Sequence, residues 1–225
     1  NFLFIVFGTL FAMIVAILLS ELRARTYVKI AQSTFLFPHF ISWVIVSYIM
    51  YSLFGTQFGL INQALELVGL PRHNWYADAA PWPRILLGLN IWRNTGMRTV
   101  IYLAAIAAID PQLYEAATID GANRWQRVVH ITLPHLWPVV AILTLLAIGR
   151  IFYADFGMIY TIVRDNGLLF ATTDVIDTYV FRALRLNGDT AQAMAANLYQ
   201  AFFGFVLVYF SNWFTRKLFP EGALY

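Results

Sequence analysis

The chain has 225 residues, of which 60% are hydrophobic and only 12% are charged, and its formal net charge at pH 7 is +3. A water-soluble domain carries about 25% charged residues, so this composition indicates a chain solvated mainly by lipid. The arginines are dispersed along the sequence, which argues against binding of nucleic acid. The lack of cysteine excludes disulfides, cysteine metal sites and a thiol nucleophile.

Five apolar stretches are long enough, or nearly long enough, to cross a membrane, which takes about 20 mainly apolar residues in a helix. Runs such as 139–148 are apolar on every face, which excludes the alternating strands of a membrane barrel. We therefore predict an all-α, polytopic membrane protein that forms a single transmembrane domain over residues 1–225. The predicted spans are, in chain order, 2–20, 34–54, 85–109, 136–153 and 191–214.

The first predicted span begins abruptly. Asn1 lies inside an apolar run, and no Met, charged segment or signal-peptide cleavage site precedes it. We therefore expect the native protein to have a further segment before Asn1, so that five spans are the expectation for this sequence and not for the native subunit.

The connections between the spans predict the orientation, because cytoplasmic loops carry the excess of Lys and Arg. The side formed by 21–33, 110–135 and the C-terminus collects seven of these residues, and the opposite side collects five. We therefore predict that 110–135 is cytoplasmic. The two outer connections, about 55–84 and 154–190, are long and rich in turn residues, and we expect them to meet a partner outside.

The connection 110–135 has the sequence of two short helices separated by a turn. Asp110 is able to cap the first free amides while Pro111 occupies the first helical position, where its missing N–H is harmless. Asp120-Gly121 supplies the turn, since glycine adopts positive φ without strain. The segment is therefore expected to fold as a helix–turn–helix at the membrane surface.

The second of these helices is expected to run from Ala122 until it stops before Pro134. In the first helix, Leu113, Ala116 and Ala117 recur at helical spacing and are predicted to pack against the bundle. This leaves a different face for a partner, formed by Gln112, Glu115 and Thr118.

Nine residues separate Gly121 from the sequence Ile131-x-Leu133-Pro134. With Glu115-Ala-Ala117 before the glycine, this segment resembles the EAA loop of binding-protein-dependent ABC permeases. Within that superfamily the chain is similar to the oligosaccharide and polysaccharide importers, which are related to the maltose-type permeases and include an alginate importer. The further segments that carry the similarity are 37–43, 91–96, 101–105, 109–111 and 221–225.

The resemblance implies a permease domain without chemistry of its own, in a bacterial inner membrane. Its expected partners are a homologous second permease, two ATP-binding subunits that hold ATP and Mg²⁺, an extracytoplasmic solute-binding protein and a saccharide. Glu115 would accept a charge-assisted hydrogen bond from the ATP-binding subunit. The family usually has a sixth, N-terminal span. The residues implied in ATPase coupling are Glu115, Ala116, Ala117, Asp120, Gly121, Ala122, Ile131, Leu133 and Pro134.

Motifs for catalysis or metal binding are not expected in this chain. The only lysines are Lys29 and Lys217, and neither follows a glycine, so no Walker A motif is possible. The four histidines do not have the spacing of a helical zinc site or of a catalytic triad. We therefore expect no metal or cofactor in this chain, and an ATPase on other subunits. The histidines are His39, His73, His130 and His135.

Polar residues inside the predicted spans are candidates for the transport path, because an arginine at the centre of a span usually faces a cavity or a partner. Asn90, Asn94 and Arg98 share one helical stripe. They either face the path or form a buried network between helices, and the sequence leaves both open. The full set of candidates is Asn90, Arg93, Asn94, Arg98, Arg150, Tyr153 and Asp155.

Several alternatives also stay open. Aromatic residues near the outer side are suited either to stacking on sugars or to interfacial anchoring. The arginines of the spans would suit an acidic saccharide such as alginate fragments, but they also suit a neutral sugar or another small solute. Two rival functions remain. One is an intramembrane glycan or lipid transferase that uses Arg93, Asp155 and a histidine, and the other is a channel or receptor subunit. The aromatic residues are Trp43, Tyr48, Tyr51, Tyr153 and Tyr160.

Overall fold

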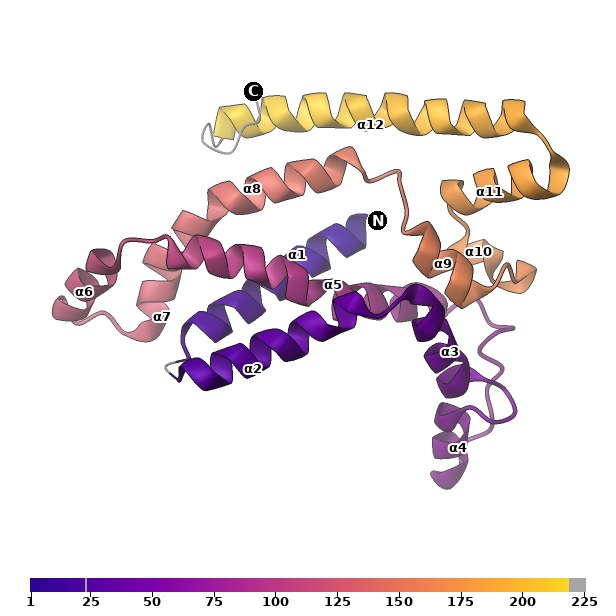
Figure 1. Cartoon of the computed structure of the whole chain (residues 1–225), viewed down its shortest axis with the longest axis horizontal. Coiled ribbons are helices and arrows are strands. Elements are labelled where there is room, and N and C mark those ends of the chain that lie inside the picture. The colour runs from indigo at the N-terminus through magenta and orange to yellow at the C-terminus, as the bar shows by residue number, and fades with distance from the viewer. Residues whose placement is uncertain (23, 219–225) are drawn as a thin grey trace. The chain divides into compact units, whose positions relative to one another are not determined.

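The structure is a computed structural model that describes residues 1–22 and 24–218, and every regular element within them is a helix (Figure 1), which confirms the all-α class. The similar segment 221–225 lies outside the described residues. The first half holds α1 (Phe2–Ser20), α2 (Arg25–Leu36), η1 (Phe37–Phe40), α3 (Trp43–Phe54), α4 (Leu60–Leu67), α5 (Trp82–Ala107) and α6 (Pro111–Ile119). The second half holds α7 (Arg124–Arg127), η2 (Val128–Thr132), α8 (Leu133–Gly149), α9 (Phe156–Val163), η3 (Gly167–Leu169), α10 (Phe170–Thr173), α11 (Ile176–Asn187) and α12 (Thr190–Leu218).

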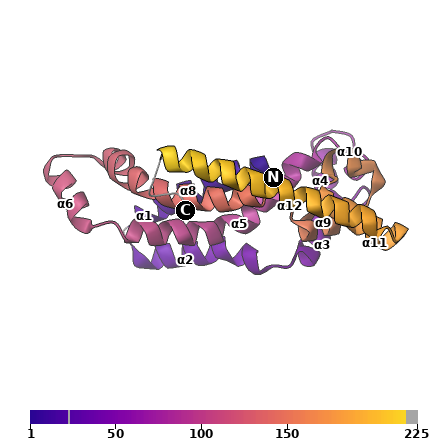
Figure 2. The same ribbon diagram turned by 90° about the horizontal axis from the view of Figure 1, so that it is seen from above.

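The helices form two compact units. Unit 1 contains residues 1, 40–89 and 152–203, and unit 2 contains 2–39, 90–151 and the chain from 204 onward. In both views of the molecule α6 lies at one end of unit 2, beyond α1 and α2 (Figures 1 and 2).

Among the described residues, three helical stretches are each long and apolar enough to cross a membrane, namely α1, the continuous stretch Arg124–Gly149 and Thr190–Lys217 of α12. They overlap the predicted spans 2–20, 136–153 and 191–214. The predicted span 85–109 lies within α5 except for its last two residues. This helix has 26 residues, but asparagine and arginine in its middle lower its mean hydropathy, so it is not among the three stretches.

The predicted span 34–54 is not one unbroken helix, although its two halves together are long and apolar enough for a span. The structure has two helical segments there, Thr26–Phe40 and Trp43–Phe54, which meet at an angle of 93°. Pro38 lacks an amide hydrogen and Ser42 takes an extended conformation, with φ −67° and ψ 149°. The Ser42 hydroxyl accepts a hydrogen bond from Ile45 N at 3.3 Å, so a new helix begins here.

The core of unit 2 joins α1, α5 and α8. Its buried residues are Ala12, Ala16, Tyr102, Leu136 and Val140. The two alanines allow the neighbouring helices to approach closely, as is common in membrane bundles. Elsewhere large apolar side chains are exposed, for example Leu198 and Phe205 on α12, as expected of a chain that meets lipid or other subunits.

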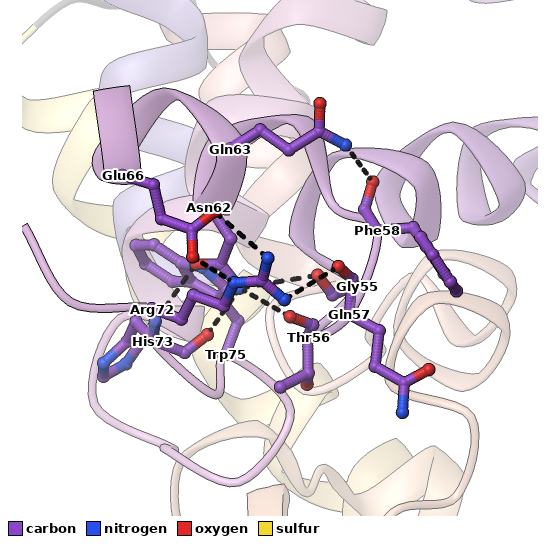
Figure 3. A network of polar contacts seen from close by, with 10 residues as sticks. All are labelled: Gly55, Thr56, Gln57, Phe58, Asn62, Gln63, Glu66, Arg72, His73 and Trp75. Atoms are coloured by element: carbon purple, nitrogen blue, oxygen red, sulfur yellow. Dashed lines mark hydrogen bonds and ion pairs between the residues drawn. The ribbon is translucent and has the colours of Figure 1, made fainter. Parts of the chain in front are cut away.

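Unit 1 is built on α3 and α9, which pack against each other. The indole of Trp43 donates a hydrogen bond to Asp155 Oδ2 at 2.9 Å, and the Thr161 hydroxyl donates to the Trp43 carbonyl at 3.3 Å. The connection between α3 and α5 wraps around Asn62, which is 1% exposed. Asn62 Oδ1 accepts from the amide of His73 at 3.1 Å and from the indole of Trp75 at 3.0 Å (Figure 3).

Candidate coupling segment and transport path

The first helix of the segment 110–135 begins as predicted. Asp110 is its N-cap, and its carboxylate accepts a hydrogen bond from the amide of Gln112 at 2.9 Å. Pro111 occupies the first turn. Both residues therefore have the roles that the sequence indicates for them.

The helix α6 ends at a left-handed glycine. Gly121 has φ +80°, and a Cβ built there would meet nothing within 4 Å, so glycine is needed for the backbone angle and not for space. The amide of Ala122 donates to the Ala117 carbonyl at 2.9 Å, and the amide of Gly121 donates to the Thr118 carbonyl at 3.1 Å. This pair of bonds is a Schellman motif, which satisfies carbonyls at the helix end.

The second helix begins two residues later than predicted. Asn123 is the N-cap of α7 and forms a capping box with Gln126, with hydrogen bonds of 2.9 Å and 2.8 Å between their side chains and amides. The sequence analysis missed this pair, although an asparagine followed three residues later by a glutamine is a signal for it.

Pro134 does not stop the second helix, which corrects the prediction. The chain passes through the π-turn η2 directly into α8, and the amide of Leu133 donates to the Val128 carbonyl, five residues earlier. A proline ring clashes with the carbonyl four residues before it, and the wider π-turn makes room for that ring. The coupling segment is therefore continuous with a helix of membrane-spanning length.

The face of α6 that packs differs from the predicted one. Tyr114 and Ala117 are half-buried, whereas Leu113 and Ala116 are exposed, and Leu113 is 43% exposed. Tyr114 decides the orientation, because its hydroxyl lies 3.0 Å from the Thr132 hydroxyl of η2. The prediction placed small apolar residues against the bundle and overlooked this polar contact.

A second contact fixes α6 to α7 from the other side. Arg127 Nη1 donates a hydrogen bond to the Thr118 hydroxyl at 3.0 Å. The two helices therefore form one element with large exposed apolar side chains, since Ile119 is 86% exposed and Trp125 is 72% exposed. Glu115 is also exposed, and it forms no hydrogen bond or ion pair with any residue that the structure describes.

A surface cavity of about 310 Å³ follows the turn between the two helices. It is lined by five of the nine predicted coupling residues, while Glu115, Ala116, Leu133 and Pro134 lie outside it. The lining residues are Ala117, Asp120, Gly121, Ala122, Gln126, Arg127, His130 and Ile131.

The polar residues of α5 are mostly directed into unit 2. Asn90 is 6% exposed, and its Oδ1 has no hydrogen-bond partner among the described residues. Arg98 Nη1 donates to the Phe4 carbonyl at 3.3 Å and lies against Gly8, where any Cβ would collide with it. Arg93 and Asn94 are half-buried. The hydrogen bond from Arg98 to α1 is the kind of contact expected of a buried network between helices. A role in the transport path stays a prediction for all four residues.

Three further candidates follow near the end of α8 and after it. Arg150 and Tyr153 are exposed. Asp155 is half-buried and has two local roles, since its Oδ1 caps α9 by accepting from the Met158 amide at 3.0 Å and its Oδ2 accepts from Trp43. Asp155 therefore has structural contacts within unit 1, and a role of these three residues in the transport path stays a prediction. The structure has no cluster of three or more potential metal ligands within the part of the chain that it describes.

The fold and this segment define a class of protein, namely a polytopic helical membrane protein that presents a rigid, exposed pair of helices continuous with a membrane-length helix. Residues 2–220 match the family model of the binding-protein-dependent transport system inner membrane component, and the chain belongs to this family.

Two relatives from Bacillus subtilis (strain 168) are similar along most of the chain. The polygalacturonan/rhamnogalacturonan transport system permease protein YteP is 37% identical over 210 residues, which cover 93% of this chain and 64% of YteP. Protein LplB is 32% identical, with coverage of 93% and 65%. The chain thus spans just under two thirds of the length of these relatives.

Two solved structures have the same fold. The bacterial alginate ABC transporter in complex with alginate pentasaccharide-bound periplasmic protein gives a TM-score of 0.89 at 33% identity, with coverage of 95% of this chain and 74% of that chain. A bacterial ABC transporter involved in the import of the acidic polysaccharide alginate gives 0.90 at the same identity and coverage.

Proposed function

We propose that this chain is a permease subunit of an ATP-driven importer of oligosaccharides or polysaccharides, and that an ATP-binding subunit contacts the helix pair α6–α7. The exposed and internally fixed helix pair is the observation that carries the proposal. Glu115 lies on its exposed surface, where a basic residue of the partner would pair with its carboxylate.

In this proposal the helix pair transmits movement because its parts cannot shift independently. The Schellman motif at Gly121 and the capping box of Asn123 fix the turn, and the contact of Tyr114 with Thr132 ties α6 to η2. A displacement of α6 is then passed through η2 to α8, which belongs to the same continuous helical stretch. Two positions of this rigid element would bias two states of the bundle.

The remaining parts of the importer are proposed from the family. We assign ATP and Mg²⁺ to two partner subunits, substrate delivery to an extracytoplasmic solute-binding protein, and the other half of the pore to a second permease, all at a bacterial inner membrane. The names of the relatives favour a saccharide, and those of polygalacturonan and alginate favour an acidic one.

Reconstitution of the complete transporter in proteoliposomes tests the proposal. Binding protein loaded with an oligosaccharide is expected to stimulate ATP hydrolysis and uptake, and acidic oligosaccharides are expected to stimulate most strongly. A transporter that responds to no saccharide would contradict the proposed substrate class. Glycan or lipid transfer by the isolated chain would favour the transferase, and conduction without ATP-binding subunits would favour the channel.

A further inference from the structure

A cavity of about 770 Å³ lies in unit 1 at the end of α3, distinct from the coupling segment and from the polar residues of α5. We name it the Tyr51 pocket. Its size falls in the range of about 300–1,000 Å³ that is usual for ligand sites. Three aromatic and three polar side chains line it, namely Tyr51, Phe58, Tyr76, Ser52, Thr56 and Gln57.

Hydrogen bonds from side chains fix the backbone of residues 56–58 in the pocket wall. Asn62 Nδ2 donates to the Thr56 carbonyl at 3.2 Å, Arg72 Nη1 donates to the Gln57 carbonyl at 3.2 Å, and Gln63 donates to the Phe58 carbonyl at 3.1 Å (Figure 3). Three successive carbonyls are thereby fixed by residues of the same connection. The exposed side chains of Gln57 and Phe58 are therefore presented by a rigid backbone, and Phe58 is 82% exposed.

An arginine that is not itself one of the lining residues stacks on Tyr51 of the aromatic wall. The guanidinium carbon of Arg164 lies 4.4 Å from the ring centroid of Tyr51 and 5.8 Å from that of Tyr48. Arg164 and Asp165 both have positive φ, of 58° and 51°, which side chains other than glycine adopt rarely and often at functional sites.

The turn that carries Arg164 is fastened to the pocket. Asn166 Nδ2 donates to the Tyr76 carbonyl at 2.6 Å, two residues after Arg164. The Tyr76 ring lies 5.9 Å from the Tyr51 ring, centroid to centroid. The arginine and the two tyrosines are thus held together by contacts between segments that are far apart in the sequence.

The charge of Arg164 is available to a ligand. Its side chain is exposed and forms no ion pair within the part of the chain that the structure describes. The acidic residues Asp165 and Asp174 both pair with Arg182, at 3.5 Å and 2.5 Å respectively. Two other acidic residues of unit 1 are also paired, Glu66 with Arg72 and Asp78 with His73.

Tyr76 also leaves a polar group unsatisfied. Its hydroxyl is buried and has no hydrogen-bond partner among the described residues. Burial raises the pKa of Tyr76, an effect that Arg164 opposes, so the phenol is neutral and keeps its proton. Buried hydroxyls are normally paired, and a ligand or water in the adjacent pocket would supply the missing partner.

We infer that the Tyr51 pocket is a subsite for an acidic saccharide, in which a hexuronate ring packs against the aromatic wall and its carboxylate pairs with Arg164. The inference rests on the proposed function and deepens it. Aromatic walls with a few placed polar groups suit a sugar ring, and an exposed guanidinium binds a carboxylate through two parallel hydrogen bonds. Its position in an outer connection suits the first contact with a substrate released from a binding protein.

The test uses the complete transporter in proteoliposomes and compares two substrates loaded on the binding protein. One is a galacturonate oligosaccharide, and the other is its methyl ester, which has the same length but no charge. Arg164→Gln is expected to raise the half-saturating concentration of the acid about tenfold, as loss of one good ion pair would, and to leave that of the ester unchanged. Arg164→Lys keeps the charge but loses the fork of donors, so it is expected to restore part of the effect. Arg84→Gln is the matched control, since Arg84 is another exposed arginine of unit 1, and it is expected to change neither substrate.

An equal effect of Arg164→Gln on the acid and on the ester would overturn the inference in favour of a structural role or of docking by the binding protein. No effect on either substrate would also overturn it. Equilibrium binding of labelled oligogalacturonate to the purified transporter separates the two proposals. If binding depends on Arg164 but no saccharide stimulates ATP hydrolysis, the proposed function is refuted and the subsite is retained. If saccharides stimulate ATP hydrolysis but binding does not depend on Arg164, the subsite is refuted and the proposed function is retained.

Discussion

Two segments end their first helices with the same device. One is the connection between α3 and α5, which is predicted to lie on the outer side and is called the outer connection, and the other is the candidate coupling segment between α5 and α8. In α4, the amides of Gly69 and Leu70 donate to Glu66 and Leu65, and Gly69 has φ +78°. In α6, Gly121 has φ +80° and the corresponding bonds form. The two motifs match, yet the regions differ in what holds them beyond the turn.

The coupling segment is held by several separate side-chain contacts, of which the contact between Tyr114 and Thr132 joins the residues farthest apart in the sequence, 18 positions. The outer connection is organised around one buried side chain, since Asn62 bonds to residues on both sides of it in the chain (Figure 3). The coupling segment is thus held at several separate points, whereas the connection around Asn62 is held by one central side chain.

The largest effect is expected from Gly121→Val. A β-branched residue strongly resists the left-handed conformation, so the Schellman motif breaks and α6 loses its fixed position. We expect the maximal rate of saccharide-stimulated ATP hydrolysis to fall at least tenfold while the protein still inserts into the membrane. The measurement is ATPase activity of the reconstituted transporter with saturating loaded binding protein.

Gly69→Val is the matched control, because φ and the open space around the glycine are nearly the same. It strains the outer connection but leaves α6 intact, so the maximal stimulated rate is expected to be retained. If both variants lost the maximal rate equally, the special role of the coupling segment would be refuted.

Asn62→Ala is expected to have the next largest effect, on the outer connection alone. The change leaves the amide of His73 and the indole of Trp75 without an acceptor, which costs about 2 kcal/mol or more. We expect amide hydrogen exchange in residues 55–75 to become about 30-fold faster, as this free energy implies. Exchange in 110–135 is expected to stay unchanged.

Gln63→Ala serves as the comparison for this variant, since it removes a single exposed hydrogen bond to the Phe58 carbonyl. Its exchange rates are expected to stay within about threefold of the wild type. A similar acceleration in both variants would show that Asn62 is not the centre of the connection.

The difference between the two regions also explains what the sequence predicted. The cap at Asp110, the proline after it and the turn at Gly121 are local signals, and the structure confirms them. The all-α class follows from composition and run length in the same way. Residues whose conformation depends on their neighbours in sequence are thus predictable from the sequence alone.

Long-range contacts were not predictable. Nothing local indicates that Asn62 accepts bonds from residues 11 and 13 positions later, or that Arg164 stacks on Tyr51. The bend at Ser42 and the π-turn before Pro134 were missed because the same apolar run is compatible with a straight helix and with a broken one. For two of the predicted transport-path residues, Arg98 and Asp155, the structure shows side-chain partners that the sequence did not indicate.

Tyr114→Phe is expected to have a smaller effect, because it removes only the hydrogen bond to Thr132 and keeps the ring. A single bond of this kind contributes about 1 kcal/mol. We expect stimulated ATP hydrolysis to fall about two- to fivefold, with no change in the amount of protein in the membrane. Tyr27→Phe on the exposed surface of α2 is the control, and an equal loss there would remove Tyr114 from the coupling element.

The smallest effect is expected from acid, and it falls on the outer connection. The hydrogen bond from Arg72 lowers the pKa of Glu66 below its ordinary value of 4.5, although both side chains are exposed. A lowered pKa means that the carboxylate is more favourable in the folded than in the unfolded chain, so its contribution is present above pH 4.5 and is lost as the pH falls through the lowered pKa. Glu66→Gln is therefore expected to lower the melting temperature at pH 7 by no more than about 2 °C, since an exposed pair contributes little. At pH 3 the wild type and the variant should melt closer together. A difference that grew on acidification would reverse the sign and would show that Arg72 does not stabilise this carboxylate.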